Sequence, residues 1–418
     1  MKNIYSSSKK CDKSFEFLLI IVFLSSLLPE YISPFLIPIY FLFYIVKKKK
    51  IKFDKINIFQ LLLIFYMFIS SIWSNTSLFT LGISFLWLNM FLIQIIINSE
   101  VDSIPKIRQV IQFFSAGACI SAIIGILQII SLYLSKVFNI INLVPNPLYR
   151  YIDDFVYKIL PFDTNIRYFI TRASSTYCNP NIYVTLLIIS FPLMLYLYKT
   201  SLKSKKIYLI GLIILFLGVL STKSRMALLV ILLSLIIETL IFNKKEKKYT
   251  YITLVLAIII SFLVISNRLN SINILGGNSS NTHFKIWHSC LNYMFNNPLT
   301  LIFGTGSGVQ NSWSILLNIY NINFPHAHNI LIQLVMEIGI IGLSIFLIPF
   351  IYKIKLIRNQ FNKNKILFLS LLNMLICYFI LGMTDYLFNS PKQLMLLYIM
   401  FGIIESSINI YKVKEKKI

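Results

Sequence analysis

The sequence predicts an all-α polytopic membrane protein, and three observations lead to this fold class. Of its 418 residues, 57% are hydrophobic and only 13% are charged. The mean hydropathy is +0.76. The charges lie between apolar runs of roughly 17 to 25 residues, the length that a helix needs to cross a bilayer. A soluble domain or a nucleic-acid-binding protein would not distribute its charges in this way, so we expect spanning helices that satisfy their own backbone hydrogen bonds.

We expect about twelve spans in one integral membrane domain that covers residues 1–418. The first run follows a basic flank like a signal peptide, but it has no small-residue cleavage site and is therefore kept as a span. The second is short and contains Pro34 and Pro38, so a re-entrant hairpin is the alternative for this opening pair. The expected spans lie near 15–29, 32–46, 57–73, 79–97, 109–134, 181–198, 207–221, 226–242, 249–266, 328–352, 366–383 and 393–410.

The charge distribution predicts the orientation. The chain has 39 Lys and Arg residues against 15 Asp and Glu residues, a net charge of +24. If both termini are cytoplasmic, 29 of those 39 cations fall in inner segments, as the positive-inside rule requires. The charge therefore indicates orientation and contact with anionic membrane lipids, and we expect no nucleic-acid partner.

Two long segments, 135–180 and 267–327, are then extracytoplasmic, and we expect the second to carry the active site. All four histidines fall in the second segment or directly after it. Five of the seven arginines are also on the outer side, whereas most lysines are inside. Lysine suffices for topology, but the planar fork of arginine is the better group for phosphate or carboxylate oxygens. The outer arginines are Arg150, Arg167, Arg172, Arg225 and Arg268.

The strongest candidate is His328, at the outer end of the tenth expected span. It is followed by Asn329 and, further on, by Gly339 and Gly342. On an ideal helix both glycines would lie on the His328 face, about 16 Å deeper, and would allow close helix contact. An imidazole held at that position could act as a general base. The alternative is a histidine that merely begins a helix.

Two further segments suggest an anion site. Ser221 to Arg225, which includes Lys223, places two cations at the outer membrane boundary, where they could hold a lipid pyrophosphate. Arg172 precedes Asn179-Pro180-Asn181, a plausible helix start whose N-terminus would favour an anion. Structural turns or caps are the alternative for both segments.

Weaker signals accompany these. Gly304 and Gly306 do not follow a strand, so we expect a flexible turn rather than a dinucleotide site. Asp385, in the short loop before the last span, could orient a base or bind sugar hydroxyls. A disulfide between Cys178 and Cys290 is an open possibility. No cysteine and histidine cluster with metal-ligand spacing occurs in the sequence, so we expect no metal.

In this order, these residues resemble the O-antigen ligase and polymerase family of bacterial envelope glycosyltransferases. The resemblance extends over about 170–345, and its most specific part is His328-Asn329 followed by Gly339 and Gly342. The other matching pieces are Arg172, Asn179-Pro180-Asn181, Thr222-Lys223-Ser224-Arg225, Trp287 and the Gly304-Thr305-Gly306 turn.

The resemblance implies a GT-C-like helical fold and a glycosyltransferase of the cytoplasmic (inner) membrane that needs neither metal nor cofactor. The donor would be a glycan on undecaprenyl pyrophosphate, and the acceptor another glycan or lipid A core. His328 would accept the acceptor's proton, and Arg225 would bind the pyrophosphate and stabilise the leaving group. Chain-length regulators or other polysaccharide-assembly proteins are further partners that the family suggests.

The sequence departs from the family at one position. The family usually has an arginine four residues before Trp287, and His283 stands there instead. Lys285, Arg172 or Arg268 could supply the missing cation. The sequence does not separate ligase from polymerase. A flippase for lipid-linked oligosaccharides is the alternative from another functional class; its expected marks are a repeated architecture and ionisable groups near mid-membrane.

Overall fold

The computed structural model describes residues 13–47, 50–138, 142–152, 171–239 and 279–415 of the chain. Within these ranges the secondary structure is entirely helical, without β-strands. In the part of the chain that the structure describes, six helices are long and apolar enough to cross a membrane: α4 (Ser77–Glu100), α5 (Ile104–Phe138), α7 (Pro180–Thr200), the helix containing α14 (Ile330–Gln360), α15 (Lys365–Gly382) and α16 (Pro391–Glu415). The protein is therefore a polytopic helical membrane protein, as the apolar runs predict.

The remaining expected spans in the described ranges are shorter than the roughly 20 residues that a bilayer requires. They form α1 (Lys13–Leu24), α2 (Leu36–Val46) after the short helix η1 (Ser33–Phe35), α3 (Lys55–Ser70), α8 (Lys205–Ser221) and α9 (Arg225–Glu238). The span expected at 249–266 lies outside the described residues, as do Arg167 and Arg268.

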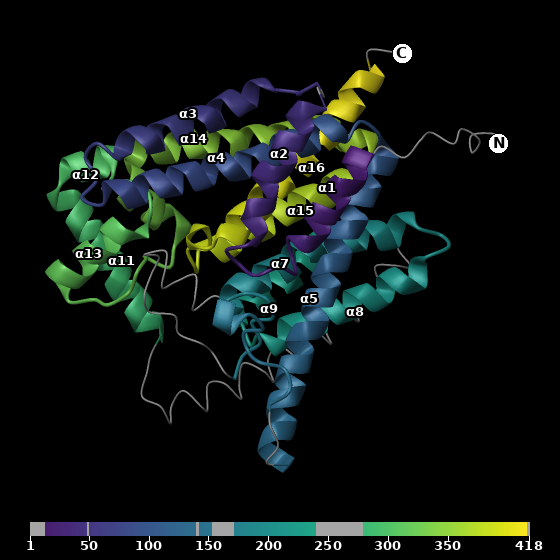
Figure 1. The fold of residues 1–418 in the computed structure, drawn as a ribbon, viewed down its shortest axis with the longest axis horizontal. Coiled ribbons are helices and arrows are strands. Elements are labelled where there is room, and N and C mark those ends of the chain that lie inside the picture. The colour runs from purple at the N-terminus through teal and green to yellow at the C-terminus, as the bar shows by residue number, and fades with distance from the viewer. Residues whose placement is uncertain (1–12, 48–49, 139–141, 153–170, 240–278, 416–418) are drawn as a thin grey trace.

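The helices pack around α16, whose apolar part is almost entirely buried (Figure 1). Helix α4 lies along α16, and α3 lies along α14. Helix α7 contacts α8 and α15, and α9 contacts α15 as well. Each of these helices therefore buries one side against a neighbour, while α3 and α5 still expose large apolar side chains such as Phe65 and Ile130, as expected of a surface in lipid.

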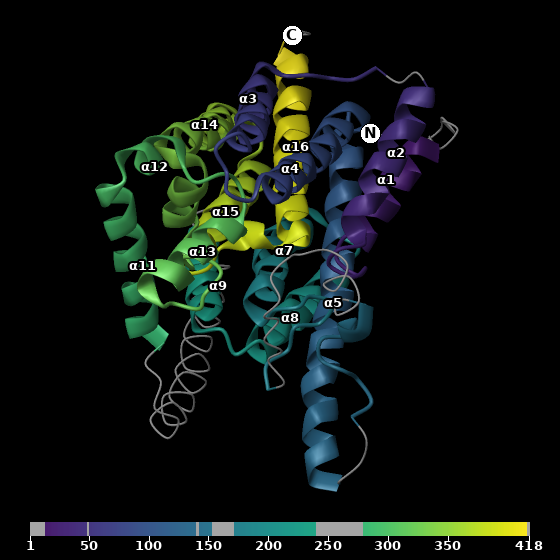
Figure 2. The ribbon, with the colours of Figure 1, turned by 60° about the vertical axis from the view of Figure 1, so that its left-hand side comes forward.

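The second long segment that we expect to be extracytoplasmic is not simply a polar loop. Its described part folds into α11 (Ser279–Asn296), α12 (Pro298–Phe303) and α13 (Val309–Tyr320). These three helices gather at the end of the bundle where α14 begins (Figures 1 and 2). They enclose a small apolar core of their own, which includes Ile286, Leu316 and Met336. Segment 279–327 is thus a folded cap on the helix bundle.

Polar side chains are also buried between the long helices. Lys353 of α14 pairs with Glu405 of α16, and both side chains are almost fully buried. Gln94 donates a hydrogen bond to Glu405 at 2.8 Å. Ionisable groups therefore occur inside candidate spans as well as in the segments between them. The cysteines Cys178 and Cys290 are both free thiols, so the disulfide considered for them does not form.

Candidate functional site

His328 lies in the turn before α14 rather than on the helix. Its φ of 50° is left-handed, a conformation that cannot continue into a helix. The helix begins at Ile330 because Asn329 is its N-cap, with a side-chain oxygen that accepts hydrogen bonds from Leu331 and Ile332. The Asn329 amide also donates to the Met383 carbonyl at 3.1 Å, which fixes the turn against the end of α15. The expected helical position of His328 is therefore wrong, although its location at the end of a span is right.

The His328 ring has three neighbours from three elements. Its Nδ1 lies 3.0 Å from Oδ1 of Asp385, in the loop between α15 and α16. The ring of His283, on α11, stacks on it with centroids 4.8 Å apart. The ring of His326 meets it edge-on at 4.2 Å. Asp385 and His283, both candidates from the sequence, are thus in contact with His328.

The surroundings determine the charge states of these neighbours. Burial, together with His328 nearby, lowers the pKa of His326 to about 3. The same two causes lower the pKa of His283. Burial would raise the pKa of Asp385, but the hydrogen bond and the charge of His328 outweigh it and hold this pKa below its usual value. At neutral pH the site therefore contains two neutral imidazoles and a carboxylate beside His328.

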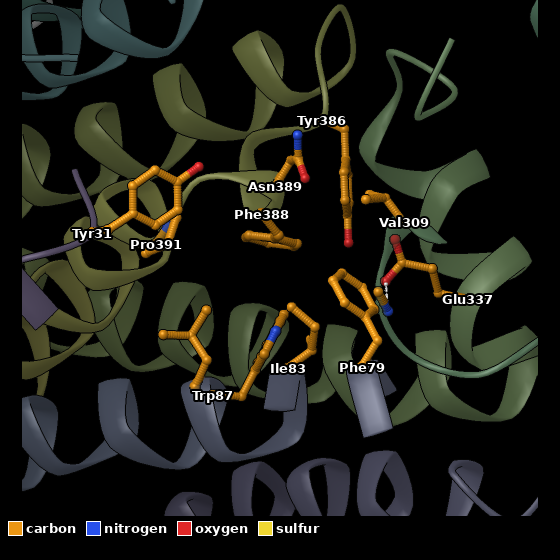
Figure 3. Close-up of a pocket in the computed structure, with 12 residues that line it drawn as sticks. Tyr31, Phe79, Ile83, Trp87, Val309, Glu337, Tyr386, Phe388, Asn389 and Pro391 are labelled. Carbon is orange, nitrogen blue, oxygen red and sulfur yellow. Dashed lines mark hydrogen bonds between the residues drawn. The ribbon is translucent and has the colours of Figure 1, made fainter. Parts of the chain in front are cut away.

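A buried carboxyl group that the sequence analysis missed supports this arrangement. Glu337 of α14 accepts hydrogen bonds from the Gln333 amide and from the Gly308 backbone, both at 2.8 Å. Gln333 in turn accepts from the Ala327 backbone, next to His328. On the other side, the Tyr386 hydroxyl points toward the Glu337 carboxyl (Figure 3). Glu337 therefore connects the turn before His328 with the residue after Asp385.

A small pocket lies next to Glu337 and Tyr386. It has a volume of about 30 Å³, room for roughly two water molecules. Tyr386, Glu337 and Trp87 line it, and aromatic rings close most of its sides (Figure 3). The pocket is too small for a sugar, so the substrate must approach His328 from elsewhere.

The glycines of the recognised motif have different uses. Gly339 has a φ of 65° and interrupts α14. A Cβ there would lie 2.1 Å from the Ile302 carbonyl oxygen of α12, so its close approach is to α12. A Cβ at Gly342 would instead meet Ile338 in the preceding turn of the same helix. The expected face shared with His328 does not exist, because the helix begins after His328 and breaks at Gly339.

The Gly304–Gly306 turn is the other half of this contact. Gly304, Gly306 and Gly308 all have positive φ. A Cβ at Gly304 would lie 2.3 Å from the Glu337 carbonyl oxygen. The Gly306 backbone donates to that same oxygen at 3.0 Å. The glycines therefore let this turn pack directly on the backbone of α14.

A second cluster forms around Arg172. Its guanidinium donates to the Thr222 carbonyl at 2.8 Å and to the Asn181 side chain at 2.6 Å. Asn179 is the N-cap of α7 and Pro180 its first residue, as the sequence predicts. Arg172 thus joins the two segments that were expected to form an anion site, and part of its fork is used to hold them together.

Arg225 and Lys223 lie beside this cluster. Lys223 is exposed at a positive φ of 51°, and Arg225 is the first residue of α9. Helix α9 runs antiparallel to α15, because Ser370 contacts Glu238 and the later residue Asn373 contacts the earlier residue Ser234. Nine residues separate Ser234 from Arg225 and Asn373 from Gly382. At 1.5 Å per residue, Arg225 is therefore level with the end of α15, close to the loop that carries Asp385.

The other candidates lie on α11. The Trp287 indole donates to the Ala327 carbonyl at 2.7 Å and so holds α11 against the His328 turn. Lys285 is exposed, and two residues rotate a helix by about 200°, so it faces away from the side that carries His283. Lys285 is therefore poorly placed to replace the missing arginine beside the histidines.

The histidine cluster also has the composition of a metal site. His326, His328 and Asp385 each offer a ligand atom, and these atoms lie within 4.8 Å of one another. However, the His326 Nδ1 accepts from the His328 backbone at 3.3 Å, and the His328 Nδ1 faces Asp385. Both inward-facing nitrogens are engaged within the protein, and the expected independence from metal remains a prediction.

Comparison with known proteins agrees with these motifs. Residues 210–347 match the sequence model of the family described as O-Antigen ligase. This segment includes Arg225, His283, Glu337 and the whole His328 to Gly342 motif, whereas Arg172 and Asp385 lie outside it. No curated protein matches the chain. The chain is therefore a multi-pass helical membrane protein in which residues 210–347 are similar to the O-antigen ligase family.

Proposed function

We propose that this protein transfers or polymerises an undecaprenyl-pyrophosphate-linked oligosaccharide on the outer face of the cytoplasmic membrane. The family implies an enzyme of the glycosyltransferase type that acts on lipid-linked glycans. The observation that carries the proposal is the contact between His328 and Asp385 within 3.0 Å. A histidine oriented by a carboxylate is a common arrangement for a general base.

The proposed reaction is a direct displacement. With Nδ1 directed at Asp385, the Nε2 atom of His328 is the free base that accepts the proton of an acceptor hydroxyl. The hydroxyl oxygen forms a bond to the anomeric carbon of the donor, and the bond from that carbon to the pyrophosphate breaks with inversion. The two electrons of the broken bond leave with the undecaprenyl pyrophosphate.

Arg225 is the proposed ligand of the pyrophosphate, with Lys223 beside it. A diphosphate is already a good leaving group, so neutralising its charge and positioning it matter more than acid catalysis. Arg172, whose guanidinium binds Thr222 and Asn181, would hold this segment in place. Because His283 replaces the family arginine, the second phosphate-binding cation of this chain is best sought among Arg172, Lys223 and Arg268.

The proposed topology has twelve spans, both termini in the cytoplasm and a GT-C-like arrangement, with residues 1–418 as one membrane domain. Segments 135–180 and 267–327 would face outward, and the latter would carry the active site. The lysine-rich inner segments support this orientation. The acceptor is another lipid-linked repeat unit or lipid A core, and chain-length regulators are candidate partners.

One observation favours the flippase alternative. Lys353 and Glu405 form an ion pair inside candidate spans, where transporters keep such groups. However, both are almost fully buried, and Lys353 also lies against the Phe401 ring at 4.4 Å. An ion pair without access to solvent is better explained as a structural contact that joins α14 to α16.

The test is a transfer assay with purified protein in detergent, where no compartments exist and transport cannot be detected. We expect His328→Ala to abolish transfer from lipid-linked repeat units and to leave expression unchanged. His288→Ala, an exposed histidine of α11, is the matched control and should remain active. Activity that persists in His328→Ala would reject the base, and loss of all wild-type transfer in EDTA would reject independence from metal.

A further inference from the structure

A cleft of about 510 Å³ lies at the edge of the cap formed by α11, α12 and α13. This is the size of a site for a small organic ligand. Its walls come from the turn between α3 and α4, from the end of α11, from α12 and from the glycine turn that follows it. The residues that line the cleft include Trp73, Asn75, Tyr293, Thr300, Phe303 and Thr305.

The aromatic wall of the cleft is held in a fixed orientation. The Trp73 indole donates to the Gly304 carbonyl at 3.2 Å. Its ring also meets Phe303 and Tyr66 edge-on, with centroids 6.3 and 6.1 Å away. Despite these contacts, Trp73 is 38% exposed and Phe303 40%. Large aromatic faces are therefore ordered in advance and still accessible, which reduces the entropic cost of binding a ligand.

Two polar side chains of the cleft can also form hydrogen bonds with a ligand. Among the described residues, the side chains of Asn75 and Thr300 make no hydrogen bonds. An amide supplies both donors and an acceptor, and a hydroxyl can donate or accept. An isoprenoid tail would leave these groups without partners, whereas a sugar offers hydroxyls to them and C–H groups to the aromatic faces.

We propose that this cleft binds a non-reacting sugar residue of the glycan, at a distance from the bond that is formed. The inference rests on the proposed glycan substrate. Helix α11 carries both His283, which stacks on His328, and Tyr293, about 15 Å further along. A glycan with its reacting end at His328 would therefore extend toward the cleft.

The floor of the cleft is connected to the support of His328. The Thr305 backbone donates to the Met336 carbonyl at 2.8 Å, and Gly306 donates to that of Glu337. Glu337 is the residue that holds the turn before His328 through Gln333. A sugar in the cleft thus contacts the same turn of backbone that fixes the base, so binding there and positioning at His328 share one rigid element.

Calorimetry with the purified full chain in detergent tests the proposal. The probes are oligosaccharides of one and of three repeat units, released by mild acid from the lipid-linked glycans of the host. For wild-type protein we expect the three-unit probe to bind about tenfold more tightly or better, because only this probe reaches the cleft. Each of the single variants Trp73→Ala, Asn75→Ala and Thr300→Ala should reduce the difference in affinity between the two probes.

Trp313→Ala is the matched control, since Trp313 lies on α13 and does not line the cleft. It should retain the advantage of the longer probe. His328→Ala should also retain it, so a failed catalytic assignment and a failed cleft give different results. Equal affinity of both probes for wild-type protein would overturn the inference. So would a Trp73→Ala protein that loses binding of geranylgeranyl diphosphate but still prefers the longer glycan.

Discussion

The carboxylate of Asp385 does more than hold the ring of His328. It lies against Nδ1, so it selects the tautomer with a free Nε2 and favours the protonated imidazole that forms during transfer. We therefore expect Asp385→Asn to reduce kcat by about 10²- to 10⁴-fold while KM changes little. An unchanged kcat in Asp385→Asn would show that the carboxylate does not orient the base.

The free energy of unfolding should depend on pH because of His326. Its pKa is about 3 in the folded protein and about 6.5 in an unfolded chain. As pH falls below 6.5, the unfolded chain takes up a proton that the folded protein does not. Stability should therefore fall toward acid, by about 2 kcal/mol at pH 5 from this group alone.

His326→Asn should remove this slope, since the asparagine oxygen can still accept from the His328 backbone and does not titrate. The measurement is the midpoint of thermal unfolding in detergent between pH 7 and 5. His288→Asn, at an exposed position of α11, is the control and should retain the wild-type slope. A slope that is equally steep in His326→Asn would place the acid sensitivity elsewhere.

At the scale of single residues, the sequence predicts most of the site but not its connections. The spacing of His328 from its glycines, the outer cations and the Asn179 cap are visible in the chain. Asp385 could be suspected only because it stands in a short outer loop. Glu337 could not be predicted as a site residue, because it is a single carboxyl group within an apolar run. Two of its partners, Gly308 and Tyr386, come from segments distant in the sequence.

Helices α12 and α14 meet through backbone rather than through side chains. Gly339 and Gly304 allow this contact, with the notional Cβ of Gly339 only 2.1 Å from the Ile302 carbonyl oxygen. We expect Gly339→Ala to destabilise the protein by about 2 kcal/mol or more, because it adds this clash to a positive φ. Thermal unfolding in detergent measures this effect, and transfer should be lost as the turn at Glu337 shifts.

Gly82→Ala is the matched control. Gly82 lies within α4, and a Cβ there would meet nothing within 4 Å. Alanine should therefore be neutral or stabilise the helix by about 0.5–1 kcal/mol. A Gly339→Ala protein as stable as Gly82→Ala would mean that α12 does not depend on this close approach.

The lengths of the elements were less predictable than their existence. Apolar runs predict where each helix of the bundle lies, because burial in lipid or protein requires apolar side chains throughout. They do not predict the interruption at Gly339 or the separation of His328 from α14, since both follow from backbone conformations with positive φ. The helices α11 to α13 were missed because α11 and α13 are amphipathic rather than continuously apolar, and because α12 has only 6 residues.

The charge asymmetry of the whole molecule gives the last prediction. Leu202 and Leu143 are a matched pair of exposed leucines, 96% and 78% accessible, in loops that the charge pattern assigns to opposite sides of the membrane. In a background without native cysteines, Leu202→Cys should react with a membrane-impermeant maleimide only after the cells are opened. Leu143→Cys should react in intact cells. The reverse pattern would place helices α11 to α13 and the histidines in the cytoplasm and the lysine-rich loops outside, against the positive-inside rule. It would also contradict transfer on the outer face.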